Sequence, residues 1–276
     1  MTVRIATVVP RTHFGEGSES LNFENFARYV KEASDRGADL VVFPESYPDN
    51  WQPPANLELL DKFKVLGKKY GIHIIGSILE PVHESEKFYN TCVLINDLGE
   101  EVGRYRRTTP KLDPWLYMGG GKWEYQWERD NKLPIFETRF GSIGILICSE
   151  IYAPFLTTTL ARKGASIIVY PTGLTSNNSP LIETWKTMAW ARAIENLCVT
   201  VVTSNSTGEG GLSMICSPEE ILISTSGEGI HVSEVNLERV QLLRISHDTF
   251  MKNGPEVPFK TKPGIFLDWV REDLES

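Results

Sequence analysis

Apolar and polar positions follow two different periodicities along the chain. Runs such as 39–45 and 142–147 consist mostly of small or apolar side chains, as expected of strands buried on both faces. Around residues 23–33 the apolar positions recur at helical spacing, which predicts a helix with one face against a sheet. Strands are predicted at 3–9, 39–45, 72–79, 91–96, 102–107, 142–147, 164–172, 197–204, 212–216, 221–225 and 230–235, and further helices at 56–70, 152–163 and 180–196. This alternation predicts an α/β fold.

Two segments repeat one pattern. Residues 36–45 (RGADLVVFPE) and 163–172 (KGASIIVYPT) both contain a basic residue, Gly, Ala, a polar residue, four apolar or aromatic residues and Pro. The copies begin 127 positions apart and predict two similar halves that share one architecture. In this register Thr172 occupies in the second half the place that Glu45 holds in the first.

Composition is consistent with one large core. The chain has 276 residues, of which 41% are hydrophobic and 23% charged, and no linker of disordered composition divides it. We therefore expect a single domain over residues 1–276. The proline-containing tail, about 250–276, is expected to form a C-terminal arm that packs on a neighbour.

Charge and cysteine usage narrow the possible partners. A net charge of −8 argues against nucleic acid or an anionic membrane surface and favours a small-molecule substrate. No stretch reaches the length of a signal peptide core or a membrane-spanning helix. The cysteines form no CxxC pair, so we expect neither zinc nor a disulfide framework, and a reducing cytoplasm fits best. They are Cys92, Cys148, Cys198 and Cys216.

Reactive side chains follow the predicted buried strands. Cys148 comes directly after the run 142–147, and Glu45 ends the run 39–45. Strand ends of α/β sheets border the crevices in which ligands bind. A lone free cysteine is more often a small buried hydrophobe than a nucleophile. A glutamate at the end of a buried strand, however, has little structural reason to be there.

Glu45, Lys111 and Cys148 together suggest nucleophilic catalysis. A thiol nucleophile needs a base to remove its proton and a positive environment to hold the thiolate. Glu45 can be that base, and Lys111 can stabilise the thiolate and the oxyanion of a tetrahedral intermediate. A Cys–His pair is the rival design, but the five histidines do not stand at strand ends in comparable context.

The segment 115–127 is rich in aromatic residues and glycine, a composition often found in loops that shape a pocket. A surface lid or an oligomer contact is the alternative. We expect Trp115, Tyr117 and Thr172 to lie near the substrate.

These motifs resemble the nitrilase, or carbon-nitrogen hydrolase, superfamily. The residues that carry the resemblance are 41–45 (VVFPE), 105–107 (YRR) leading to Lys111, 144–150 (GILICSE), 191–196 (ARAIEN) and 211–213 (GLS). The resemblance implies a four-layer αββα sandwich of two sheets with an internal pseudo-twofold, which agrees with the repeat. It also implies cofactor-free attack by a cysteine on an amide or nitrile carbon, followed by hydrolysis of the thioester or thioimidate. Members commonly assemble as homodimers or higher homo-oligomers, which we expect here.

The resemblance also assigns roles. Cys148 would be the nucleophile, Glu45 the general base, and Lys111 the oxyanion stabiliser together with the backbone N–H of Ser149. Glu150 is expected to order the nucleophile loop.

A second glutamate often lies between the lysine and the cysteine of such proteins, where it positions the substrate or relays protons. Glu124 is the candidate for this role and Glu128 the alternative. A solvated loop charge is the other interpretation of Glu124.

Two departures from the family pattern affect the prediction. The family lysine usually follows the Tyr-Arg pair directly, and Arg107 stands there; Lys111 instead begins a KLDPW run similar to that of aliphatic amidase-like members. A guanidinium in this position would not shuttle protons as an ammonium can. Residues 149–151 (SEI) also differ from the Trp-Glu-Asn of true nitrilases, which favours an amide-type substrate.

We therefore predict a thiol hydrolase that cleaves a non-peptide C–N bond in a small amide or N-carbamoyl compound. Nitrile hydrolysis by the same site is an alternative. A catalytically silent member that binds a metabolite or a partner protein is another, and acyl transfer to an amine is a third.

Overall fold

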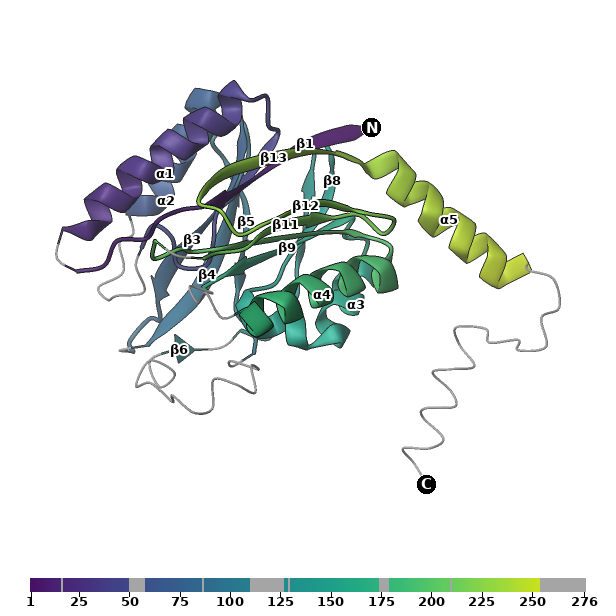
Figure 1. Cartoon of the computed structure of the whole chain (residues 1–276). Helices are drawn as coiled ribbons and strands as arrows, with labels where there is room; N and C mark the ends of the chain where they lie inside the picture. The colour runs from purple at the N-terminus through teal and green to yellow at the C-terminus, as the bar shows by residue number, and fades with distance from the viewer. Residues whose placement is uncertain are drawn as a thin grey trace.

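The computed structural model describes residues 1–15, 17–49, 58–85, 87–109, 127–128, 130–173, 179–208 and 210–253. Two sheets pack against each other, and a pair of helices lies on the outer side of each (Figure 1). The first sheet has the order β13 (Gly229–Asn236), β1 (Thr2–Val9), β2 (Leu40–Val42), β3 (His73–Pro81), β4 (Phe88–Ile95) and β5 (Glu101–Arg106), with β6 (Trp127–Glu128) paired to β4. The second has the order β12 (Ile221–Thr225), β11 (Ser213–Cys216), β10 (Val199–Ser204), β9 (Ile167–Thr172), β8 (Gly141–Ile145) and β7 (Ile135–Thr138).

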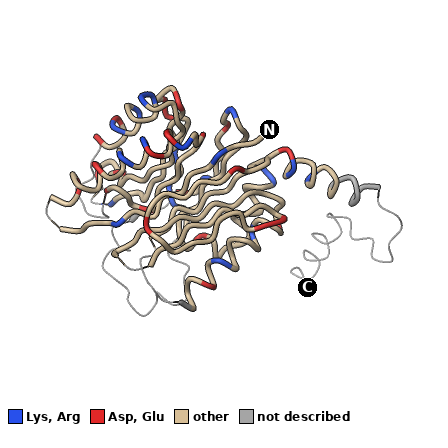
Figure 2. Tube along the Cα trace, turned by 45° about the horizontal axis from the view of Figure 1, so that its top comes forward, with Lys and Arg blue, Asp and Glu red and all other residues tan. Residues whose placement is uncertain are grey.

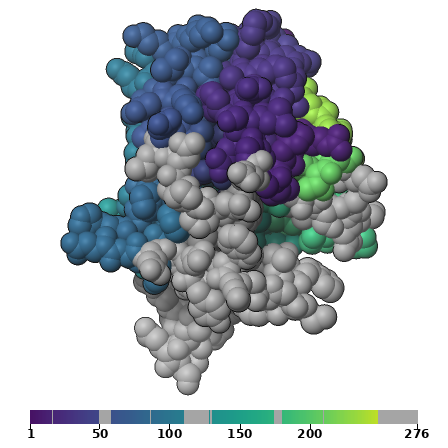
Figure 3. All heavy atoms as spheres, turned by 90° about the vertical axis from the view of Figure 1, so that its left-hand side faces the viewer, coloured from purple at the N-terminus to yellow at the C-terminus, as the bar shows by residue number. Residues whose placement is uncertain are grey.

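The helices complete a four-layer sandwich. Helices α1 (Ser18–Asp35) and α2 (Glu58–Tyr70) cover the outer face of the first sheet, on the side seen in Figure 3. Helices α3 (Pro154–Arg162) and α4 (Ser179–Asn196) cover the second. Charged residues gather on the helices, whereas most of the central strand segments carry neither sign (Figure 2). The predicted αββα architecture is confirmed.

The two sheets share one topology, which is the internal repeat predicted from the sequence. In the first sheet β1, β2 and β3 run parallel; β13 is antiparallel to β1 on one side, and on the other β4 is antiparallel to β3 and β5 is antiparallel to β4. In the second, β8, β9 and β10 run parallel; β7 is antiparallel to β8 on one side, and on the other β11 is antiparallel to β10 and β12 is antiparallel to β11. Strands β2 and β9, which carry the repeated pattern, occupy equivalent places.

Strand β2 shows why its sequence has no polar alternation. Leu40 and Val42 belong to the core between the sheets, whereas Val41 and Phe43 pack beneath the outer helices. The Phe43 ring stacks on Phe26 of α1, with 3.9 Å between ring centroids. Both faces of the strand are therefore buried, as in parallel sheets generally.

A glycine lets the second helical layer approach its sheet. A Cβ on Gly144 of β8 would lie 2.9 Å from Leu160 Cδ1 of α3. Glycine at this position allows close packing immediately before the strand reaches Cys148.

Some boundaries differ from the sequence predictions. The predicted strand 39–45 is too long: β2 ends at Val42, and the chain then turns, with Ser46 at a φ of 56°. The turn redirects the backbone at Glu45. Strands β6 and β7 were not predicted, and they are only two and four residues long.

Helix α5 (Leu237–Asn253) was also not predicted. Its first turn joins the core through Leu237 and Val240, whereas Leu242 and Ile245 are 50% and 54% exposed. The apolar residues are thus divided between the core and the surface and give no single buried stripe. Residues 254–276 lie outside the described residues, so the C-terminal arm and the homo-oligomer stay predictions. Within the described ranges, no helix is long and apolar enough to cross a membrane.

Candidate active site

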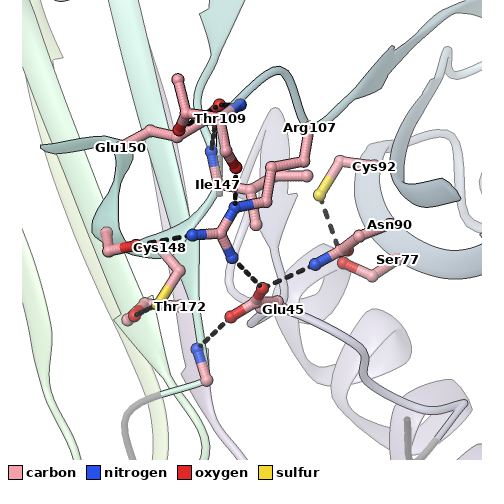
Figure 4. A network of polar contacts seen from close by, with 12 residues as sticks. Glu45, Ser77, Asn90, Cys92, Arg107, Thr109, Ile147, Cys148, Glu150 and Thr172 are labelled. Carbon is pink, nitrogen blue, oxygen red and sulfur yellow. Dashed lines mark hydrogen bonds and ion pairs between the residues drawn. The ribbon is translucent and has the colours of Figure 1, made fainter. Parts of the chain in front are cut away.

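Glu45 and Cys148 come from different sheets and meet in one buried cluster (Figure 4). Glu45 lies in the turn after β2, and Cys148 opens a short 3-10 helix, Cys148–Tyr152, after β8. Cys148 has a φ of 52°, a left-handed conformation that bends the chain sharply at the end of the strand. Glu45 is fully buried and Cys148 is partly exposed. The two strand-end residues singled out from the sequence are therefore brought together.

Arg107 lies beside both of them. Its Nη1 donates to Glu45 Oε1 at 3.1 Å, and its Nη2 donates to Ser149 Oγ at 2.5 Å. A third donor, Nε, contacts the carbonyl oxygen of Thr109 at 3.1 Å. Burial lowers the pKa of Arg107, but the neighbouring acidic groups, Glu45 first among them, outweigh it and hold the pKa above its ordinary value. Arg107 is therefore a fixed cation in the site.

Buried amides hold Glu45 in place. Asn90 Nδ2 of β4 donates to Glu45 Oε1 at 2.6 Å, and the backbone N–H of Gly173 donates to Oε2 at 2.8 Å. Asn205 Nδ2 donates to the Glu45 carbonyl oxygen at 2.9 Å, and Asn205 Oδ1 accepts from Thr12 Oγ1 at 2.7 Å. Asn90 and Asn205 were missed from the sequence, because no short-range pattern distinguishes them from other asparagines.

The Cys148 thiol has a strongly raised pKa. Burial raises it to about 12 and the charge of Glu45 adds to the effect, while Arg107 and hydrogen bonds from Thr172 and Gly173 act in the opposite direction. The resting sulfur is therefore a protonated thiol near neutral pH. A nucleophile in this state needs a base at the moment of attack.

Several predicted site residues lie outside the described residues, and their roles stay predictions: Lys111, Trp115, Tyr117 and Glu124. Glu128, the alternative second glutamate, forms an ion pair with Lys87 at 3.0 Å, with 36% of its side chain exposed. Ser149 is buried, and its hydroxyl accepts from the Arg107 guanidinium. Among the described residues, no group of His, Cys, Asp and Glu side chains is arranged to hold a metal ion.

The carbon-nitrogen hydrolase family model matches residues 5–245, a span that includes every described member of this cluster. The chain belongs to the carbon-nitrogen hydrolase family.

This carbon-nitrogen hydrolase has relatives of known name and structure. It is 27% identical over 267 residues to a deaminated glutathione amidase of Mus musculus, covering 86% of this chain and 79% of the relative. A carbon-nitrogen hydrolase from Helicobacter pylori G27 superimposes with a TM-score of 0.76 at 21% identity, covering 94% of this chain and 97% of that one. An amidase mutant from Nesterenkonia sp. AN1, with the acetamide moiety of fluoroacetamide added covalently at its active-site cysteine, gives a TM-score of 0.72 at 18% identity over 88% and 96%. The similar structures support the sandwich fold.

Glu150 ties the cysteine turn of this hydrolase to the end of β5. Its carboxylate accepts from Tyr105 Oη at 2.8 and 2.9 Å, and from the backbone N–H groups of Thr108 and Thr109 at 3.0 Å each. Oε2 also accepts from the Ile147 N–H at 2.7 Å, directly before the cysteine. The carboxylate is fully buried, and one side chain thus fixes two loops relative to each other.

Glu150→Gln is expected to lower kcat/KM by about 10- to 100-fold, because loosening these loops displaces the reacting groups. The new amide NH2 would replace an acceptor oxygen that now faces hydrogen-bond donors. We expect the free energy of unfolding to fall by about 2–4 kcal/mol. Steady-state kinetics and urea denaturation measure the two effects. An unchanged kcat/KM in a folded variant would contradict this positioning role.

Proposed function

We propose that this carbon-nitrogen hydrolase cleaves the C–N bond of a small amide or N-carbamoyl compound through a covalent intermediate on Cys148. The observation that carries the proposal is the junction of Cys148, Glu45 and Arg107 in one buried cluster, which supplies a thiol, a carboxylate and a fixed cation. Two of the similar proteins named above are amidases, and one of them carries an adduct on its active-site cysteine.

In the proposed first half-reaction, Glu45 takes the thiol proton as the sulfur attacks the carbonyl carbon. The carbonyl oxygen becomes an oxyanion, which the backbone N–H of Ser149 and a nearby cation stabilise. Collapse of this intermediate breaks the C–N bond, and Glu45 returns the proton to the leaving nitrogen. The products are ammonia, or an amine, and a thioester on Cys148.

In the second half-reaction, water attacks the thioester. Glu45 removes a proton from the water and returns it to the sulfur as the C–S bond breaks, so the acid product leaves and the thiol is restored. The carboxylate thus serves as base and acid in turn, as microscopic reversibility of the two similar steps requires.

Arg107 and Lys111 are the two candidates for the cation. Arg107 Nη1 lies 3.1 Å from Glu45 Oε1, which favours a role for Arg107 in holding the carboxylate and the developing negative charge. A guanidinium stays protonated throughout, so the proposal assigns every proton transfer to Glu45. Lys111 remains the candidate for the oxyanion itself.

The residues after the cysteine favour an amide over a nitrile. Ser149 and Glu150 follow Cys148. Ser149 Oγ accepts a hydrogen bond from Arg107, and the Glu150 carboxylate accepts one from the backbone N–H of Thr108, directly after Arg107. This sequence differs from the Trp-Glu-Asn of true nitrilases, so the proposal places amides and N-carbamoyl compounds first.

A catalytically silent binding protein is the second candidate function. Arg107, a cation that cannot give up its proton, is the observation that favours it. Such a protein would bind its ligand without forming a covalent intermediate.

A panel of amides, N-carbamoyl compounds and nitriles, read by ammonia release, tests the proposal. We expect release from at least one amide or N-carbamoyl compound, together with an acyl mass increase on the Cys148 peptide after rapid acid quench. Protein alkylated beforehand with iodoacetamide serves as the control and should release no ammonia. Binding of a panel compound with neither ammonia nor adduct would favour the silent alternative, and turnover of nitriles alone would reverse the assigned substrate class.

A further inference from the structure

The end of strand β9 contacts the sulfur of Cys148. Thr172 Oγ1 donates to Cys148 Sγ at 3.1 Å, and the Thr172 side chain is fully buried. The next backbone N–H, that of Gly173, donates to Glu45 Oε2 at 2.8 Å. One strand end therefore donates to both candidate reacting groups, the Thr172 hydroxyl to the Cys148 sulfur (Figure 4) and the Gly173 N–H to the Glu45 carboxylate.

The backbone holds these donors in place. Strand β9 lies in the centre of the second sheet, and Thr172 is paired with Ser204 of β10. A hydroxyl in such a place must find a hydrogen-bond partner, since leaving it unpaired costs free energy. Its partner here is the sulfur atom. The hydrogen bonds of Arg107 described above go to oxygen atoms instead, on Glu45, Ser149 and Thr109.

We infer that Thr172 is a catalytic residue whose hydroxyl stabilises the thiolate form of Cys148. The inference rests on the proposed function in taking Cys148 as the nucleophile. In this inference Thr172 donates a hydrogen bond to the sulfur, in addition to lying near the substrate as the sequence predicts. A hydrogen bond to an anion is stronger than one to a neutral thiol, so the donation favours the charged form.

The same strand end also holds the carboxylate that would take the thiol proton. The Gly173 N–H donates to Glu45 Oε2 at 2.8 Å. When Glu45 takes the proton, the carboxyl becomes neutral and the sulfur becomes the stronger acceptor. The Thr172 hydroxyl then donates to the thiolate, and it does so again when the sulfur leaves the thioester.

Alkylation of Cys148 measures this effect without any substrate. Iodoacetamide reacts with the thiolate, so its rate between pH 7 and 9 follows the thiolate fraction, read by mass spectrometry of the Cys148 peptide. Thr172→Val keeps the branched shape and removes the hydroxyl. We expect its alkylation to be about 3- to 10-fold slower, because the loss of thiolate is partly offset by the higher nucleophilicity of a more basic sulfur.

Three comparisons separate a role on the sulfur from other roles. Thr172→Ser retains a donor and should recover most of the alkylation rate, whereas Thr172→Ala should remain slow; circular dichroism confirms that each variant is folded. Equal slowing in the serine and valine variants would mean a packing role and would overturn the inference. A changed KM with an unchanged alkylation rate would instead assign Thr172 to substrate binding alone.

The same experiment distinguishes the inference from the proposed function. If the valine variant is alkylated slowly but the wild-type protein hydrolyses no compound, the donor role stands and the proposed function fails. If the wild-type protein hydrolyses amides and the valine variant is alkylated at the wild-type rate, the proposed function stands and the inference fails.

Discussion

Glu45→Gln is expected to lower kcat/KM by about a thousandfold or more, because the site would lose the proposed base while the thiol stays protonated. With the pKa of Cys148 raised to about 12, very little thiolate forms unaided near neutral pH. The glutamine amide can still contact Asn90 and Gly173 but cannot accept the thiol proton. Ammonia release over a range of pH, with the Cys148 acyl adduct followed in parallel, measures the loss.

The same substitution should destabilise the fold. Arg107 is only 4% exposed on its side chain, and Glu45 is its ion-pair partner at 3.1 Å. Removing one partner of a buried pair leaves an uncompensated charge, at a cost of about 3–5 kcal/mol in the free energy of unfolding. Urea denaturation at pH 7.5 measures this cost.

A matched surface variant separates the local effect from a general loss of charge. Glu219 also pairs with an arginine, Arg239, at 2.6 Å, but both side chains are largely exposed. Glu219→Gln should therefore leave kcat/KM and the denaturation midpoint close to wild type, because exposed pairs contribute little. If Glu45→Gln behaved like this control, Glu45 would be neither the base nor the counter-ion of Arg107.

The position of the catalytic candidates was predictable from the sequence because the strands before them are buried on both faces. Such strands have few polar residues, so the first reactive side chain after each one stands out, as Glu45 and Cys148 do. The repeat also singled out Thr172, because Thr172 aligns with Glu45 in the two copies. In the structure the Thr172 hydroxyl donates to Cys148 Sγ at 3.1 Å. These inferences need only local periodicity and the rule that parallel strand ends share an edge of the sheet.

The contacts between distant segments could not be predicted in this way. Asn90 and Asn205 reach Glu45 from β4 and from the end of β10, at sequence separations of 45 and 160 residues. Which cation faces the carboxylate depends on how the end of β5 packs against the cysteine turn, and the carboxylate of Glu150 fixes that packing. The sequence therefore left Arg107 and Lys111 as alternatives for the cation. Arg107 is the one that the described residues include, beside Glu45, and Lys111 lies outside them.

Arg107→Met is expected to reduce kcat/KM by about a thousandfold, because methionine fills a similar space but removes the positive charge that the guanidinium places beside Glu45 and the developing thiolate. Glu45 would remain buried, and among the described residues the donors left to its carboxylate would be Asn90 and Gly173. We expect the free energy of unfolding to fall by about 3–5 kcal/mol as well. Both effects arise from the missing charge. The same variant should therefore show a lower kcat/KM in ammonia-release kinetics and a lower free energy of unfolding in urea denaturation.

Arg107→Lys tests whether charge or geometry matters more. A lysine restores the positive charge but presents a single nitrogen, so it cannot contact Glu45, Ser149 and the Thr109 carbonyl in the planar arrangement of a guanidinium. We expect activity to return to within about tenfold of wild type, since the electrostatic contribution is the larger one.

Lys111→Met completes the comparison of the two cations. If Arg107 provides the decisive charge, this variant should retain most of its kcat/KM, while Arg107→Met loses it. The opposite result, with Lys111→Met nearly inactive and Arg107→Met impaired only in its stability, would assign the oxyanion to Lys111. Arg107 would then serve to hold Glu45, because its ion pair with that carboxylate is present in either case. A large loss in both variants would mean that one cation holds the base while the other stabilises the oxyanion.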